Sequence, residues 1–409
     1  MKFSNIDDLM ADDDKLSTKG MYLLHDYYKG KSSGSYPVYV LNHYSDLVVM
    51  ITIAPKDTIY GVIIKNGGLP HKTPIIAKNN EYILLDSLGA TGTIYAKTLQ
   101  QELEKCLNEL GITHATITNV DYQRQSDFVS CGTEAFLVMK EALKLGDSLF
   151  TLYQNQPVNY VPPEIAKYTQ GIARLWPVCK KGITTNLSQT VSGLKMLSIP
   201  VNKSGSHVKS ETLKSYVDRH ASPNGKFNLA VDNRRAKHRE ILQVLLATKE
   251  EKTLTKMAME ASGLNSLLSH PSALNALFPY EKIDVLYEIA GITNSFNTKE
   301  GKMVTYHFSA LRDANELQRV VKGLEETLID LVDRYLDDDN HDSNIKLYDL
   351  AKFVYAKYYF QQILDKLLLK QSSQSDSLES SALSLNSMFS IVSDNKQPSL
   401  PTREAIFHH

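Results

Sequence analysis

The chain has 409 residues, 42% of them hydrophobic, and a formal net charge of −1. This length and apolar content suffice for a packed core and predict two or three domains, and the balanced charge argues against a chain that binds nucleic acid or a membrane surface as a whole. The three cysteines, Cys106, Cys131 and Cys179, are far apart and form no CxxC pair. The sequence therefore predicts neither a disulfide framework nor a zinc site, and it favours a reducing compartment.

No segment of the sequence predicts a membrane span. The best apolar run, residues 47–55, has the length of a strand. Residues 1–14 are acidic, whereas a secretory signal peptide begins with basic and then apolar residues.

The first third of the chain alternates strand-like and helix-like segments. Runs of β-branched and aromatic residues predict strands over 36–41, 47–53, 58–64 and 114–120. Two further runs flank the polar turn 78–80 and predict a hairpin over 74–85. Apolar residues at helical spacing predict helices over 98–110 and 133–145.

The rest of the chain divides by composition. Residues 153–206 are rich in proline, and long helical periodicities follow over 240–261, 317–336 and 345–369, with an acidic loop at 337–342. A serine-rich stretch at 371–393 predicts a mobile tail. We therefore expect an α+β domain over 1–160, an extension or connector over 161–230, a helical domain over 231–370 and a flexible tail over 371–409.

The most informative segment surrounds Cys131. Gln125 precedes the cysteine by six residues, Gly132 follows it, and the predicted helix opens directly after it. A cysteine at a helix N-terminus gains thiolate character from the free amides and the helix dipole. The amides of Cys131 and of the Gln125 side chain could both donate to an oxyanion, and Gly132 would let a substrate backbone come close.

A base and its orienting acid are predicted upstream. His71 stands just before one strand of the hairpin and Asp86 at the end of the next. Antiparallel pairing brings such strand ends together, and an aspartate in contact with a histidine fixes its tautomer. His71, Asp86, Gln125 and Cys131 thus supply a base, an orienting acid, an oxyanion donor and a nucleophile, which predicts a thiol hydrolase.

Ordinary interpretations exist for each residue alone. A single cysteine is most often a small buried hydrophobe, and the other three residues could lie in surface loops or turns. The order and spacing of all four favour the site. His43 and His114 compete less well for the role of base, and Cys106 and Cys179 are interpreted as structural.

These residues resemble a known group, the clan CE cysteine peptidases. That group includes the SUMO proteases, adenain, bacterial effector deubiquitinases and the YopJ-type acetyltransferases. Its pattern is a His opening a strand, Asp-Ser-Leu on the next strand, and Gln, five residues, then Cys-Gly. Here the matches are His71, residues 86–88, Gln125 and residues 131–132, within a region of similarity over 22–149.

The resemblance implies a papain-like-superfamily core with a mixed sheet flanked by helices, followed here by an all-α region. It also implies hydrolysis of the isopeptide bond after the C-terminal tail of ubiquitin or a ubiquitin-like protein. Cys131 would attack, His71 would act as base and acid, Asp86 would orient it, and Gln125 would help form the oxyanion hole. No metal or organic cofactor would be needed.

One departure points to a subgroup. Many eukaryotic members have a tryptophan directly after the histidine, where it helps to clamp the diglycine tail, but Lys72 follows here. This favours a bacterial effector deubiquitinase, secreted by a bacterium and working in the host cytoplasm. The tail 371–409 resembles signals for type IV secretion, and an ordinary disordered tail has the same composition.

Two alternatives remain open. The first is a YopJ-type Ser/Thr/Lys acetyltransferase, which uses acetyl-CoA on the same triad and binds an inositol phosphate on a basic surface. The residues Arg234, Arg235, Lys237, His238 and Arg239 could form such a surface, and a solvated helix face has the same pattern. The second is a binding scaffold in which the helical region over 234–370 contacts a host protein or membrane; a self-contained bundle is the simpler interpretation of that region.

Overall fold

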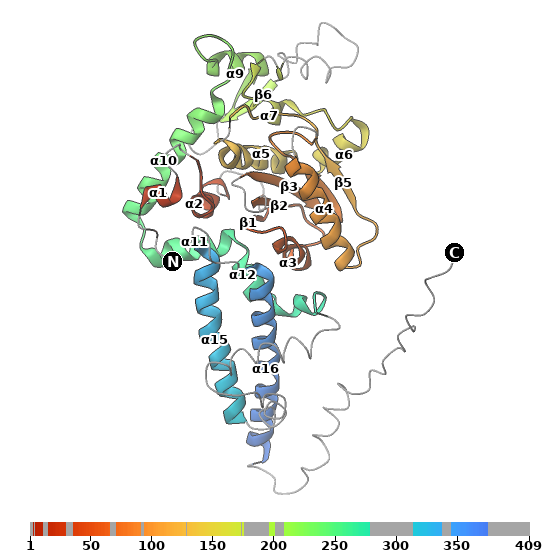
Figure 1. Ribbon diagram of the computed structural model, residues 1–409, viewed down its shortest axis with the longest axis vertical. Coiled ribbons are helices and arrows are strands. Elements are labelled where there is room, and N and C mark those ends of the chain that lie inside the picture. The colour runs from red at the N-terminus through yellow and green to blue at the C-terminus, as the bar shows by residue number, and fades with distance from the viewer. Residues whose placement is uncertain are drawn as a thin grey trace, which may run out of the picture.

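The fold is known from a computed structural model (Figure 1). It describes residues 3, 5–10, 15–29, 36–65, 71–90, 94–127, 129–172, 174–175, 196–200, 208–278, 314–337 and 345–374. Three predictions concern residues outside these ranges: the mobile tail beyond residue 374, most of the acidic loop at 337–342, and a structural role for Cys179.

A five-stranded mixed sheet forms the centre of the first domain. Its spatial order follows the chain: β1 (Val38–Leu41), β2 (Tyr60–Lys65), β3 (Lys72–Lys78), β4 (Glu81–Leu84) and β5 (Thr116–Asn119). The outer pairs, β1 with β2 and β4 with β5, are parallel, and the two inner pairs are antiparallel. Nearly every residue of β2 and β3 is buried, so both faces of the sheet centre are covered.

The hairpin of β3 and β4 confirms the turn predicted from the sequence. Asn79 and Asn80 occupy the turn with φ angles of 49° and 64°. Asparagine tolerates this left-handed conformation better than most residues, and two such residues in succession give the tight turn that suits twisted strands. The register that follows pairs Ile75 with Leu84.

The remaining elements of the first part of the chain are helical. They are α1 (Ile6–Leu9), α2 (Thr18–Lys29), α3 (Asp46–Ile53), α4 (Ile94–Glu109), α5 (Cys131–Leu145), α6 (Asp147–Asn155) and α7 (Pro163–Ala166). Helix α5 packs against β2 and β3, and α2 packs against β1. The predicted class is confirmed: an α+β core with a mixed sheet, a cysteine at the start of a helix, and an all-α region after it.

One predicted strand is wrong. Residues 47–53 belong to α3, which runs from Asp46 to Ile53. Residues 46–51 are all buried, so the segment is apolar on almost every side. A short helix buried all round has no 3.6-residue periodicity to distinguish it from a buried strand, and its β-branched residues then favour the wrong choice.

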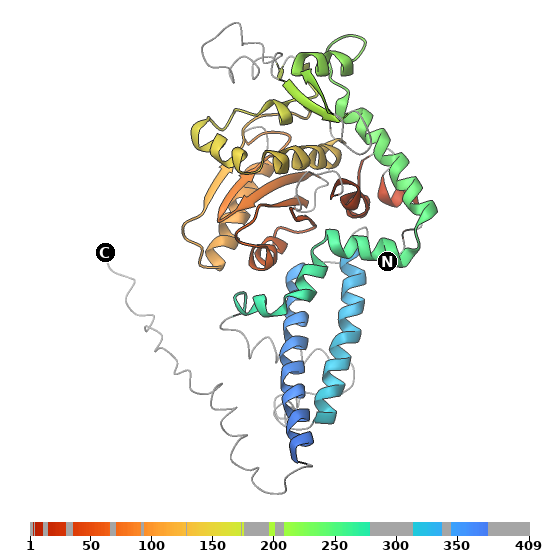
Figure 2. The same ribbon diagram turned by 180° about the vertical axis from the view of Figure 1, so that it is seen from behind.

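The later elements extend from the core. They are β6 (Met196–Pro200), β7 (Val208–Thr212), α9 (Leu213–His220), α10 (Ala230–Thr248), α11 (Glu251–Ala261), α12 (Leu264–Ser269), the 3-10 helix η2 (Pro271–Asn275), α15 (Ala314–Leu336) and α16 (Leu347–Gln374). The helix predicted over 240–261 is thus two helices, because the chain becomes extended at residues 249–250. Helices α10 and α11 contact α2 of the core, while α15 and α16 lie side by side and project from it (Figures 1 and 2).

A buried carboxylate joins the projecting pair to the core. Asp46 accepts hydrogen bonds from the Leu347 N–H at 2.7 Å and from the Tyr335 hydroxyl at 3.1 Å. Asp46 therefore caps the start of α16 from a different element and also holds the end of α15. Within the described residues, no helix is long and apolar enough to cross a membrane.

Candidate active site

Cys131 is the first residue of α5, as the sequence predicts. Its side chain lies where the first amides of the helix have no partner within the helix and where the dipole favours negative charge. The packing of α5 on β3 brings this helix start to the edge of the sheet where β3 begins. Only 2% of Cys131 is exposed, so the thiol lies in a closed site.

His71 and Asp86 meet at that edge. His71 directly precedes β3 and Asp86 follows β4 by two residues, so the antiparallel register places them together. The Nε2 atom of His71 lies 3.1 and 3.0 Å from the two carboxylate oxygens of Asp86. Two further donors hold this carboxylate, the Thr73 hydroxyl at 2.7 Å and the Leu88 N–H at 2.8 Å.

The histidine also reaches the cysteine, and the pair has shifted pKa values. Burial disfavours the imidazolium, but hydrogen bonds to Asp86 and Cys131 outweigh it and raise the pKa of His71 to about 10. Burial alone would raise the pKa of Cys131, yet the hydrogen bond from His71 and the charges of Lys72 and His71 lower it. Since Nε2 is taken by Asp86, the Nδ1 atom is left for the thiol. Both shifts favour a thiolate beside an imidazolium.

The fourth predicted residue, Gln125, is buried beside Ser87, the residue after Asp86. The side chain of Gln125 is 2% exposed and its amide is engaged on both sides. Its Oε1 accepts from the Ser87 hydroxyl at 2.6 Å, and its Nε2 donates to the backbone carbonyl of Asp127 at 2.7 Å. The structure thus brings His71, Asp86 and Cys131 together but turns Gln125 toward the loop before the cysteine. Its oxyanion role stays a prediction.

Asp127 organises that loop, which sequence reasoning missed. One oxygen accepts from the N–H groups of Val129 and Ser130, at 3.0 and 2.8 Å, and the other from the Ser130 hydroxyl at 2.6 Å and Gln170 Nε2 at 2.7 Å. Burial works against the charge, but the bonds from Ser130 and Gln170 lower the pKa of Asp127. The aspartate three residues before a helix cap is the sequence signal that could have indicated this turn.

A buried ion pair links two of the segments that carry the site. Arg124 and Glu134 are 0% and 1% exposed, and the Arg124 guanidinium donates to the Glu134 carboxylate. The same guanidinium donates through Nη2 to the Leu85 carbonyl at 2.6 Å. The pair therefore connects the residue before Asp86 to the first turn of α5. Nothing in the local sequence pattern indicates that these two charges pair.

The packing around Gly132 also favours a glycine. A Cβ atom on Gly132 would lie 3.2 Å from the Cβ of Leu16 and 3.5 Å from the Cδ of Lys72. The close neighbours of this glycine are therefore side chains of the protein itself. The approach of a substrate backbone at this position stays a prediction.

The competing residues lie away from the triad. The N–H of His43 donates to Asp46, and His114 is exposed. Cys106 is buried with its sulfur 3.9 Å from the Tyr44 carbonyl, and burial raises its pKa to about 12. Such a thiol is inert at neutral pH, in agreement with its interpretation as structural.

A second charged group lies further along α5. Lys140, Lys144 and Lys167 surround Glu141, with ammonium-to-carboxylate distances of 3.7, 3.8 and 3.2 Å. Burial, with the charges of Lys144, Lys167 and Arg234 working against that of Glu141, lowers the pKa of Lys140 to about 8. We call Lys140, Lys144, Lys167 and Arg234 the cation cluster.

The basic run on α10 is not a uniformly solvated face. His238 is buried between the Tyr28 hydroxyl and Thr133, and Arg235 donates to the Ser130 hydroxyl at 3.1 Å. Of the run, only Lys237 is fully exposed. Helix α10 therefore contacts α5 on both sides of Cys131 in sequence, at residues 130 and 133.

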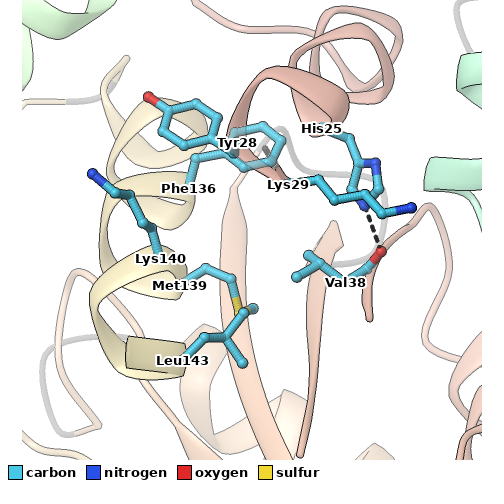
Figure 3. A pocket seen from close by; sticks show the side chains of 8 residues that line it. All are labelled: His25, Tyr28, Lys29, Val38, Phe136, Met139, Lys140 and Leu143. Atoms are coloured by element: carbon cyan, nitrogen blue, oxygen red, sulfur yellow. Dashed lines mark hydrogen bonds between the residues drawn. The ribbon is translucent and has the colours of Figure 1, made fainter. Parts of the chain in front are cut away.

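A narrow slot lies beside the cation cluster (Figure 3). Met139, Lys140 and Leu143 line it from α5, and residues of α2 face them. Tyr28 of α2 stacks on Phe136 of α5 with ring centroids 5.0 Å apart. The slot measures about 20 Å³, which is room for a single water, so it is no substrate pocket. Its apolar walls explain why the Lys140 stem is buried.

Comparison with known proteins gives distant structural matches only. No protein-family model and no curated protein matches the sequence. A solved structure of AvrA delL154 with IP6 and CoA is 16% identical, covers 56% of this chain and 90% of that chain, and has a TM-score of 0.39. HopZ1a in complex with IP6 is 12% identical, covers 57% of this chain and 89% of that chain, and has a TM-score of 0.38. Values this low assign neither a family nor a function, so function has to be inferred from the site.

Proposed function

We propose that this chain is a thiol acetyltransferase of the YopJ type, with Cys131 as nucleophile. The thiolate of Cys131 attacks the carbonyl of acetyl-CoA, and the protonated His71 gives its proton to the departing CoA thiolate. A hydroxyl or amine of a protein acceptor then attacks the acetyl-cysteine while His71 takes its proton, which releases the thiolate. Asp86 holds His71 in the required tautomer throughout.

The observation that carries this choice over hydrolysis is the cation cluster. Three ammonium groups, from Lys140 and Lys144 of α5 and Lys167 at the end of α7, share the carboxylate of Glu141, and the charge of Arg234 on α10 acts on Lys140. Half-buried cations that outnumber the nearby anions repel one another. An anion bound among them would remove the free-energy cost of this repulsion. The distribution over three elements suits an anion with several phosphates, such as inositol hexakisphosphate.

Contacts between α10 and the start of α5 would let such an anion influence the position of the nucleophile without touching it. Arg234 of the cluster is neighbour to Arg235, which donates to Ser130, the residue before Cys131. A polyphosphate that holds α10 in place would therefore also hold the loop before Cys131. IP6 and CoA, the ligands in the similar structures of AvrA and HopZ1a, are the two compounds to test.

Removal of ubiquitin, the function predicted first from the sequence, shares the first half of this chemistry. Both reactions form an acyl-enzyme on Cys131, so the triad alone does not separate them. No contact among the described residues corresponds to a clamp for a diglycine tail, and the cation cluster has no role in isopeptide hydrolysis. We therefore treat the ubiquitin isopeptidase as the outcome that would replace the proposal.

The working compartment belongs to the same proposal. Reduced thiols at Cys106 and Cys131 agree with a reducing cytoplasm. We place the protein as a bacterial effector in a host cell, where acetyl-CoA and inositol polyphosphates are both present to be bound.

A panel of reagents tests the proposal. The full chain is incubated with acetyl-CoA and a mixture of host proteins, with and without inositol hexakisphosphate, and separately with a ubiquitin that carries a C-terminal electrophile. We expect acetylation that depends on the polyphosphate, is lost in Cys131→Ala and is kept in Cys106→Ala. A covalent ubiquitin adduct at Cys131 without acetyl transfer would replace the proposal by the isopeptidase.

A further inference from the structure

Lys72 lies next to both His71 and Cys131. It is the first residue of β3, directly after His71, and only 4% of it is exposed. Its Cδ lies 3.5 Å from where a Cβ on Gly132 would stand, so its stem runs along the first turn of α5. Its backbone N–H also makes a hydrogen bond to Cys131.

We propose that Lys72 is a further active-site residue, whose ammonium stabilises the thiolate of Cys131. The inference rests on the proposed function only in taking Cys131 as the nucleophile. It holds for transfer to an acceptor and for hydrolysis alike, because both begin with the same thiolate.

The charges at the site explain why a second cation is needed. Asp86 and Cys131 are both anionic when the site is ready to react, and His71 alone supplies one positive charge for the two. Those three groups are 0%, 2% and 7% exposed, and a net negative charge without a partner is costly at such depth. The ammonium of Lys72 brings the sum to zero.

The arginines near Cys131 are engaged with carboxylates. Arg124 is engaged with Glu134, and Arg235 lies 3.2 Å from Asp232 and 3.8 Å from Asp127. Charged and titratable groups near Cys131 include His71, Lys72 and Asp86 from the strand ends, Arg124 and Asp127 from the loop, Glu134 from α5 and Arg235 from α10. Three more lie beside these: Tyr95 stacks on His71, Lys65 pairs with Lys72 in the β2–β3 register, and His238 contacts Thr133. Lys72 is the cation whose charge acts on Cys131 together with that of His71.

A role in packing alone is the competing explanation. The Lys72 stem lies against Gly132 and near Leu16, so any substitution could disturb the start of α5. Lys72→Met keeps an unbranched apolar stem and removes the charge, whereas Lys72→Arg keeps the charge on a bulkier end. Lys252→Met, on the exposed face of α11, removes one positive charge far from the site.

The test is the pH dependence of Cys131 ionisation in the full chain. It is measured as the ultraviolet absorbance of the thiolate, taken as the difference from Cys131→Ala, and as the rate of alkylation by iodoacetamide with the Cys131 peptide identified by mass spectrometry. Neither readout needs a substrate, so failure here is distinct from failure of the acetyl-transfer test. Melting temperatures confirm that each variant is folded.

We expect Lys72→Met to raise the apparent pKa of Cys131 by about one unit, which slows alkylation about tenfold at pH values below it. The rate at high pH, where all the thiol is ionised, should be unchanged. Lys72→Arg and Lys252→Met should keep the profile of the natural chain. An unshifted profile in Lys72→Met, or an equal shift in Lys72→Arg, would overturn the proposal.

Discussion

The two ends of α5 carry two groups of charged side chains, which differ in how well their charges are balanced. At its start, Cys131, His71 and Asp86 form a closed set linked by hydrogen bonds, and we propose that Lys72 supplies the second positive charge. About three turns later, Lys140 and Lys144 share Glu141 with Lys167 near Arg234, and cations exceed anions. The charges of the first group are matched within the protein, whereas the excess of cations in the second is the basis of the proposed anion site.

Under the proposed function, the group at the start of α5 carries out the reaction and the cation cluster regulates it. A balanced set of buried groups keeps its geometry without help and suits a reaction centre. An unbalanced set changes its free energy strongly when a ligand binds, which suits a site that responds to a ligand. Substitutions in the two groups should therefore differ in kind as well as in size.

The largest effect is expected at the nucleophile. Cys131→Ala removes the only group that forms the acyl-enzyme, so acetyl transfer should fall by about 10³-fold or more. Cys106→Ala, the matched change at the other described cysteine, should keep activity because that thiol stays protonated. Equal losses in both variants, measured as acetyl transfer by folded protein, would contradict the role of Cys131.

Asp86→Asn should come next. The amide cannot hold the imidazolium, and it prefers the wrong tautomer of His71, so turnover should fall by about 10²- to 10⁴-fold. The measurement is kcat at neutral pH. Asp147→Asn, at an exposed carboxylate paired with Lys78, is the control and should leave kcat unchanged. A rise in KM with kcat unchanged would mean that Asp86 does not act through His71.

A moderate effect is expected in the cation cluster. Arg234→Gln and Lys140→Met should each weaken binding of inositol hexakisphosphate by about 10- to 100-fold, because each removes one charge-assisted contact of about 1.5–3 kcal/mol. Lys237→Gln is the matched control on α10, since Lys237 is exposed and paired with Glu240. Calorimetry measures the affinities, and similar losses in all three variants would show that only the overall charge matters.

The smallest effect concerns pH. Because the pKa of Lys140 is lowered to about 8, the free protein holds fewer protons there than the unfolded chain between that pH and the usual lysine range. This group therefore contributes stability that rises with pH above about 8, and an anion that needs the charged lysine binds more weakly there. Affinity should fall more steeply with pH above about 8 in the natural chain than in Lys140→Met. Parallel pH profiles would remove Lys140 from the anion site.

The sequence predicted the parts of this picture that follow from local rules. Paired asparagines fixed the turn, the turn fixed the register, and the register joined His71 to Asp86. It also placed Cys131 at a helix start. The division of the chain into domains at 160, 230 and 370 stays a prediction.

The parts that the sequence did not predict depend on contacts between distant segments. Helix α3 looked like a strand because burial on all sides erased its periodicity. The pairing of Arg124 with Glu134 and the turning of Gln125 toward Asp127 depend on how the loop before α5 closes. The neighbours of Gly132 come from residues 16 and 72, which only the fold brings together.

The most direct test of the central claim is the mass of the peptide that contains Cys131. The full chain is incubated with acetyl-CoA, with and without inositol hexakisphosphate, and digested at low pH. We predict one added acetyl group on Cys131, removable by hydroxylamine and far more abundant with the polyphosphate. An unmodified Cys131 under both conditions, together with a ubiquitin adduct at the same residue, would contradict the account.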